Sequence, residues 1–164
     1  MSRARAPTQQ LGELLQEFIN RVSHLQGNTL RVLTEGSVTL QQVLLLRRLK
    51  QLGESSPSEL AAVMRMSLPA VSQMVDRLFF LGLVTRVEAA DDRRRKRIAV
   101  AGKGDSLLAR IRRSRAAEYT AGTARISPSV RAELRSVLQK ALRELPEEAD
   151  ALASEFPGAR VRRA

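Results

Sequence analysis

Five consecutive basic side chains, Arg93-Arg94-Arg95-Lys96-Arg97, form the segment of this sequence whose chemistry is easiest to predict. Cations at this density bind phosphate groups, and arginines can also enter the minor groove of DNA. Asp91 and Asp92 precede the run, and a carboxylate there can pair with an arginine and fix its direction. The segment therefore predicts contact with a polyanion, with a solvated charged loop as the alternative.

The charge of the whole chain agrees with a polyanionic partner. The 164 residues include 28 Lys and Arg against 17 Asp and Glu, a net charge of +11. Residues 86–115 hold eleven basic and four acidic side chains, so more than half of the net charge falls in this segment. Nucleic acid is the first partner that this excess favours, and an acidic membrane surface is the second.

The residue types argue against catalysis and against a metal or cofactor site. The chain has no cysteine, which excludes thiolate zinc sites, iron–sulfur clusters and thiol redox sensors. His24 is the single histidine, too few for a histidine-rich metal site. Neighbouring carboxylates such as Asp91 and Asp92 point away from each other in a helix or a strand, which is poor geometry for paired acid–base work. We expect no enzyme activity, no metal and no cofactor.

No segment approaches the ~18 uncharged apolar residues of a membrane span. The N-terminal residues are basic but lack the apolar region of a secretory signal. We therefore expect a cytoplasmic protein.

The predicted elements are mostly helices. Apolar residues recur at helical spacing along one predicted helix from about Gln9 to Leu33. Three short helices with start signals follow: a T-x-x-Q capping box at Thr39, an S-x-x-E box at Ser56 and an N-cap at Ser67. The third of them stops at Gly82.

The pattern then changes to two short strands, Leu83–Val87 and Arg97–Val100, with the basic run between them. Two more helices follow, one around Leu107 and one that begins at Ser127-Pro128 and ends before Pro146. The fold class is therefore mainly α with a small β-hairpin wing, and the order of elements is that of a winged helix-turn-helix.

The predicted helix from Leu68 to Leu81 has the features of a recognition helix. Small residues near its start allow close approach to a major groove, and Gln73 can reach the edge of a base, ideally adenine. The opposite face is apolar and is expected to hold the helix against the core: Val71, Met74, Val75 and Leu78.

Five motifs stand in order between residues 38 and 110: T-L-Q-Q from Thr39, S-E-L-A from Ser58, V-S-Q-M-V-D-R-L from Val71, G-L-V from Gly82 and D-D-R-R from Asp91. In this order and at these spacings they resemble the MarR/SlyA family of bacterial transcription regulators. The chain departs from the family pattern at Pro69 and Ala70, where small hydroxylated residues are common, and at Gln73, where arginine is common. Base readout is therefore expected to differ from that of other members.

The resemblance implies a homodimer on palindromic double-stranded DNA. Residues 9–36 form an N-terminal dimerisation helix, residues 37–104 the winged helix-turn-helix domain, residues 105–146 the C-terminal dimerisation helices, and residues 147–164 an acidic-then-basic tail. The expected DNA-binding residues are Ser67, Pro69, Ala70, Ser72, Gln73, Arg77, Arg93, Arg94 and Arg95. An alternative for Arg77 is an ion pair with Asp76 or another nearby carboxylate.

The resemblance also implies a repressor that a small organic molecule releases. The weak candidates for contact with such an aromatic or anionic effector are His24, Val43 and Arg47. The arginines at positions 110, 112, 113 and 115 can bind phosphates or an anionic effector, or form a solvated helix face.

Two other functions remain open. One is an architectural or anti-silencing DNA-binding protein with little sequence preference and no effector. The other is a winged-helix module whose basic wing docks an acidic protein partner.

Overall fold

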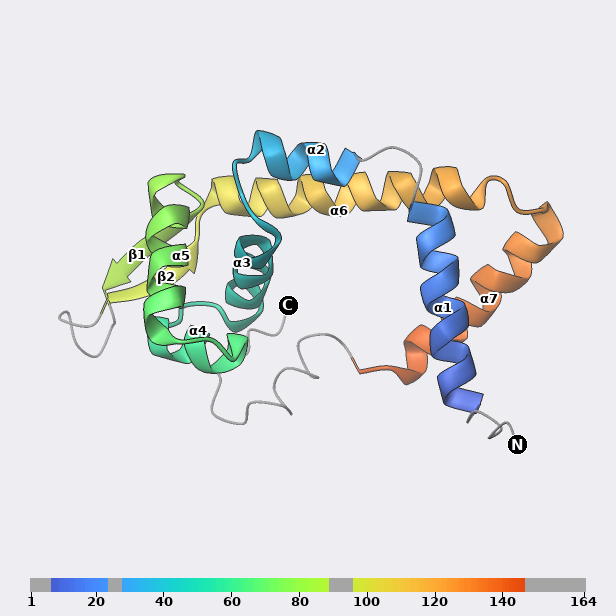
Figure 1. Ribbon diagram of the computed structural model, residues 1–164, viewed down its shortest axis with the longest axis horizontal. Helices are drawn as coiled ribbons and strands as arrows, with labels where there is room; N and C mark the ends of the chain where they lie inside the picture. The colour runs from blue at the N-terminus through green and yellow to red at the C-terminus, as the bar shows by residue number, and fades with distance from the viewer. Residues whose placement is uncertain (1–6, 24–27, 89–95, 147–164) are drawn as a thin grey trace, which may run out of the picture.

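The computed structural model describes residues 7–23, 28–88 and 96–146. In chain order, the helices and strands of these ranges are α1 (Pro7–Ser23), α2 (Asn28–Glu35), α3 (Leu40–Leu52), α4 (Pro57–Met64), α5 (Leu68–Phe80), β1 (Val84–Glu88), β2 (Lys96–Val100), α6 (Gly102–Thr123) and α7 (Pro128–Glu144). Helices α3, α4 and α5 and the hairpin gather at one end of the long α6, while α1 and α7 extend from its other end (Figure 1). The predicted fold class is confirmed.

The N-terminal region contains two helices where the sequence predicts one. The break has a tertiary cause, since Glu118 of α6 is buried and its carboxylate accepts a hydrogen bond of 2.8 Å from the backbone N–H of Thr29. In an uninterrupted helix this N–H would bond to the carbonyl oxygen four residues earlier. Gly27, just before α2, also disfavours a helix. As a result α2 lies alongside α6 instead of continuing α1 (Figure 1).

The three start signals of the central helices are confirmed. Thr39 and Gln42 close a capping box at α3, and Ser56 and Glu59 close another at α4. The Ser67 side chain accepts from the N–H of Ala70 at the start of α5. These bonds satisfy N–H groups that a helix leaves without intrahelical partners, and each is worth about 1 kcal/mol. The helix starts are thus determined by local sequence.

The strands form one antiparallel hairpin in which Val84 pairs with Val100 and Arg86 with Ile98. Gly82, with φ of 70°, makes the turn between α5 and this hairpin, a conformation that favours glycine. The alternation of the strands puts Val84 and Ile98 into the core, where each is 2% exposed. Hairpin and recognition helix therefore share one core.

A single hydrophobic core joins the winged-helix elements to α2 and α6. The largest fully buried side chains are Leu45, Leu46, Leu49, Leu60, Val71, Leu78 and Val84. The predicted core face of α5 is confirmed, with Val71, Val75 and Leu78 buried and Met74 packed against the cluster. The recognition helix is thereby held by its apolar side and turns its other side outward.

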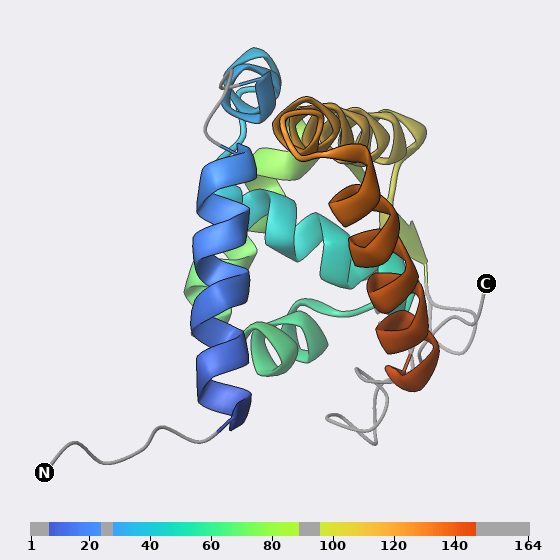
Figure 2. The same cartoon turned by 90° about the vertical axis from the view of Figure 1, so that its right-hand side faces the viewer.

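Helices α1 and α7 contribute little to this core. In α1, Val22 is buried but Leu14 is 67% exposed, and no residue of α7 is buried. Both helices extend in the same direction from the far end of α6. In a view along α6, α1 lies on one side and α7 on the other (Figure 2). Helix α7 begins after Ser127, as predicted, but the Ser127 side chain makes no capping hydrogen bond. Among the described residues, no helix is long and apolar enough to cross a membrane.

Candidate nucleic-acid interface

The outward side of α5 carries the side chains that the sequence assigns to DNA contact. Pro69, Gln73 and Arg77 are exposed, and their spacing of four residues places them on one stripe of the helix. Ser67 is exposed as the N-cap, whereas Ala70 and Ser72 are half-buried. The structure thus brings six of the nine predicted residues together on the first three turns of one helix.

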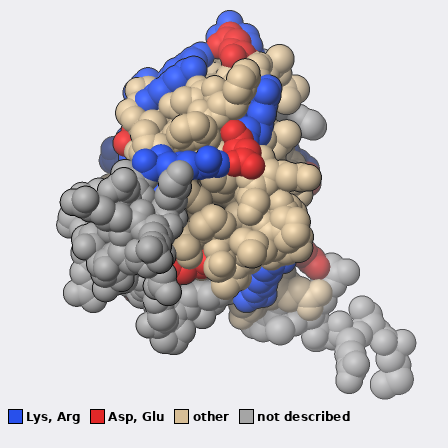
Figure 3. Space-filling model, turned by 90° about the vertical axis from the view of Figure 1, so that its left-hand side faces the viewer, with Lys and Arg blue, Asp and Glu red and all other residues tan. Residues whose placement is uncertain are grey.

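The other three, Arg93, Arg94 and Arg95, lie outside the described residues, between the two strands of the hairpin. Strand β1, which leads to them, begins just after the end of α5, and β2 returns antiparallel to it (Figure 1). Seen from this end of the molecule, the described lysines and arginines form separate groups with tan surface between them, and acidic side chains lie beside several (Figure 3).

Arg77 does not pair with Asp76. The carboxylate of Asp76 pairs instead with Arg86 of β1. The Arg77 guanidinium carbon lies 5.7 Å from the ring centre of Phe80, and that of Arg86 lies 4.8 Å from the ring centre of Phe79. These contacts are within range of cation–π attraction and leave Arg77 at the surface.

Arg86 links the recognition helix to the hairpin, and the sequence analysis missed it. The alternation of the strand could have predicted this contact. Arg86 follows Val84 by two residues and therefore shares the strand face that turns toward α5. The exposed rings of Phe79 and Phe80, 46% and 80% exposed, had no sequence signal. Together these contacts fix the end of α5 against β1.

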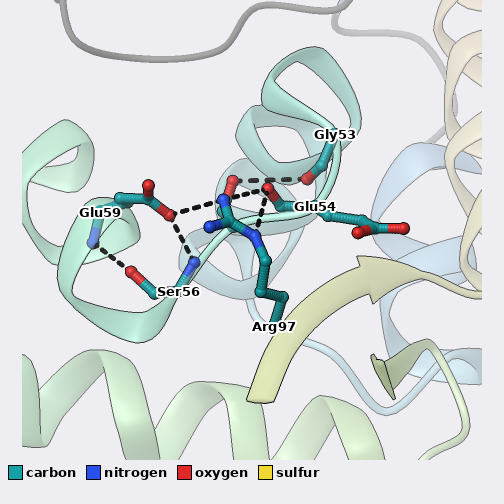
Figure 4. Close-up of polar contacts among 6 residues, drawn as sticks. Gly53, Glu54, Ser56, Glu59 and Arg97 are labelled. Carbon is teal, nitrogen blue, oxygen red and sulfur yellow. Dashed lines mark hydrogen bonds and ion pairs between the residues drawn. The ribbon is translucent and has the colours of Figure 1, made fainter. Parts of the chain in front are cut away.

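Arg97, the last residue of the basic run, is turned inward. Its guanidinium donates to the carbonyl oxygen of Glu54 at 2.6 and 3.1 Å and to the carboxylate of Glu59 at 2.9 Å (Figure 4). Of the five cations that the sequence makes available to phosphates, Arg97 is therefore engaged by partners within the protein in this structure. Its partners lie about forty residues earlier in the chain, where the local pattern gives no hint of them.

The carboxylate of Glu59 is stabilised in its charged form. Partial burial acts to raise its pKa, but hydrogen bonds from Ser56 and the nearby Arg97 guanidinium outweigh burial and bring the pKa below its ordinary value. The Ser56 N–H donates to this carboxylate at 2.6 Å as part of the capping box (Figure 4). One anionic group therefore connects the start of α4 with the hairpin.

Two of the three effector candidates lie among the described residues, one turn apart on α3. Val43 is 3% exposed in the core, Arg47 is exposed one turn later on α3, and His24 lies outside the described residues. In the part of the chain that the structure describes, no group of three His, Asp or Glu side chains is arranged to hold a metal ion.

Comparison with known proteins agrees with this geometry. The transcriptional regulator Tm0710 of Thermotoga maritima has a similar fold, with a TM-score of 0.71 and 21% identity over 81% of this chain and 92% of that one. YusO of Bacillus subtilis matches with a TM-score of 0.62 and 22% identity over 86% of this chain and 100% of its own. The MepR–DNA complex of S. aureus matches with a TM-score of 0.58 and 19% identity over 85% of this chain and 98% of MepR.

Similarity to known sequences is found in one region of the chain. Among curated protein sequences, none matches the chain significantly. Residues 38–96, which include α3, α4, α5, β1 and the first four residues of the basic run, match the model of the MarR family. Through this winged-helix region the chain is similar to the MarR family, and its overall fold is that of the matched structures.

Proposed function

We propose that this protein is a homodimeric regulator that binds a palindromic DNA site, represses transcription there and is released by a small organic molecule. The observation that carries the proposal is the exposed stripe of Pro69, Gln73 and Arg77 at the capped start of α5. A helix of this kind fits the major groove, which is ~12 Å wide. The complex of the similarly folded MepR with DNA supports this assignment.

Two kinds of contact are assigned on this DNA. Gln73 reads a base edge in the major groove, while the small residues Ser67, Ala70 and Ser72 allow the helix to come close. Arg93, Arg94 and Arg95 bind phosphates or the minor groove, which gives affinity without sequence information. Arg77, one turn after Gln73 on the same face of α5, is assigned to the phosphates beside the groove.

The dimer is assigned to residues 9–36 and 105–146, and DNA binding to residues 37–104. The support is a set of large apolar side chains that α1 and α7 leave exposed: Leu11, Leu14, Leu15, Ile19, Val130, Val137, Leu138, Leu142 and Leu145. Large apolar side chains left exposed together on two helices mark an interaction surface. A second copy of the chain would bury it.

The effector is assigned to the aromatic or anionic small molecules, with His24, Val43 and Arg47 as its candidate contacts. Because Val43 is 3% exposed, a ligand reaches this side chain only by displacing core residues of α3. Such a ligand would disturb the helices that carry α5, which couples its binding to DNA release. A panel of aromatic carboxylates, tested for release of bound DNA, examines this assignment.

The first experiment measures binding to the DNA upstream of the protein's own gene at about 150 mM salt, with excess nonspecific competitor. We expect binding that survives the competitor and a footprint with two-fold symmetry. If no fragment selected from the whole genome survives competitor, the protein is not a sequence-specific regulator. An architectural DNA binder would lose affinity with salt equally on all sequences, and a protein-docking module would bind no DNA at moderate salt.

Two substitutions separate base reading from phosphate binding. Gln73→Ala is expected to relax base preference at one position of the site, by about 1–3 kcal/mol. Arg94→Ala is expected to weaken binding to all sequences and to reduce the slope of log K against log salt by about one unit. Equal behaviour of the two variants would contradict this division of roles.

A further inference from the structure

Strand β2 is held on both of its edges. One edge pairs with β1, and the other meets Ser55 in the loop between α3 and α4. Ile98 donates to the carbonyl oxygen of Ser55 at 2.8 Å, and Ser55 donates to that of Ile98 at 3.0 Å. Ser55 is 3% exposed, so these bonds are shielded from water. The hairpin is thereby joined through its backbone to the loop that begins α4.

Arg97, next to Ile98, adds a side-chain connection at the same place. Its guanidinium donates to the Glu54 carbonyl oxygen and to the Glu59 carboxylate, and its side chain is 26% exposed (Figure 4). Arginine holds such a geometry well, because its donors lie in a rigid plane. Lysine offers a single flexible charge and would not reproduce it.

We propose that Arg97 is a positioning residue, which fixes the wing relative to α4 and so determines where the wing tip meets DNA, without touching DNA itself. The inference rests on the proposed function. Nε and Nη2 of the guanidinium are engaged by Glu54 and Glu59, so turning this edge to a phosphate would break these bonds and leave the Glu59 carboxylate without its cation. Since α4 packs against α5, a wing fixed to α4 is also fixed relative to the recognition helix.

The dependence of DNA affinity on salt distinguishes positioning from phosphate contact. Each phosphate contact contributes about 0.9 to the slope of log K against log salt. Arg97→Ala is expected to lower the affinity for the DNA site about tenfold, because the wing loses its side-chain bonds to Glu54 and Glu59, with the slope unchanged. Arg94→Ala, at the tip, is expected to lower both the affinity and the slope. A slope that falls equally in both variants would make Arg97 an ordinary phosphate contact and overturn the proposal.

Glu59→Gln is the matched variant on the other side of the contact. Glutamine can still close the capping box with Ser56, but it removes the charge that faces Arg97. We expect it to lower DNA affinity in the same direction as Arg97→Ala, again with no change of slope. The double variant should bind no more weakly than the weaker single variant, since both remove one interaction. Additive losses would contradict the proposal.

Amide hydrogen exchange tests the contact in the protein without DNA. In Arg97→Ala and Glu59→Gln, the amide of Ile98 is expected to exchange faster than in the unmodified protein, while that of Leu46 in α3 should not change. Unchanged exchange at Ile98 would overturn the positioning role. If the unmodified protein fails to bind DNA, the proposed function itself fails, and this result is separate because it does not involve the variants.

Discussion

At the scale of single residues, Glu59 stabilises the protein only while its carboxyl group is charged. Its pKa lies below the ordinary value of 4.5, since hydrogen bonds from Ser56 and the Arg97 charge outweigh partial burial. A lowered pKa adds stability that is complete above pH 4.5 and is lost as the pH falls through the folded-state value. The side chain is 47% exposed, so solvent screens much of this stabilisation.

We therefore expect Glu59→Gln to lower the free energy of unfolding at pH 7 by less than about 1 kcal/mol, and the difference from the unmodified protein to shrink below pH 4.5. Urea unfolding at pH 7, 5 and 3.5 measures it. Glu133→Gln, at an exposed position of α7, serves as the control and should change little at any of these pH values. If the difference in free energy of unfolding between Glu59→Gln and the unmodified protein grows as the pH falls, the Glu59 pKa is not lowered in the folded protein.

At the scale of elements, the contact between α1 and α6 depends on one glycine. A Cβ added at Gly122 would lie 2.4 Å from the carbonyl oxygen of Val22 and 2.6 Å from its Cα, atoms that move only if α1 moves. Gly122→Ala is expected to destabilise the protein by about 1–3 kcal/mol and to lower Tm by several degrees. In the control Gly12→Ala, where a Cβ meets nothing within 4 Å, Tm should rise slightly, because alanine favours the helix.

Thermal unfolding followed by circular dichroism measures both glycine variants. Both substitutions improve helix propensity equally. If Tm falls in Gly122→Ala and rises in Gly12→Ala, the close approach of α1 and α6 is the cause of the destabilisation. A stabilised Gly122→Ala would mean that α1 is free to shift along α6.

The elements that the sequence predicts correctly are those with local signals. The capping boxes at Thr39 and Ser56 and the change of period after Gly82 lie within a few residues of what they control. The single N-terminal helix was wrong because its break depends on Glu118, eighty-nine residues from Thr29. Arg97 was grouped with the phosphate-binding run for the same reason, since Glu54 and Glu59 come close to it only in the folded chain. For the site, residue types and spacing predicted the exposed stripe of α5 but not the contacts that hold it.

At the scale of the whole molecule, the exposed apolar faces of α1 and α7 predict that the protein is unstable as a monomer. Leu14 and Leu142 are 67% and 68% exposed, and burial of such side chains contributes roughly 1.5–3 kcal/mol each. We expect sedimentation equilibrium to give twice the chain mass of 18.2 kDa, and Tm to rise with protein concentration.

Leu138→Glu together with Leu142→Glu is expected to weaken the dimer at least a hundredfold, because two carboxylates would replace apolar contacts at its centre. Phe80→Gln provides the matched control: this side chain is 80% exposed but lies on α5, and the variant should remain dimeric. A double variant that still sediments as a dimer would move the interface away from α7. If it is monomeric, it should bind one half of the palindrome as weakly as it binds the whole, since the second recognition helix adds affinity only when it is joined to the first.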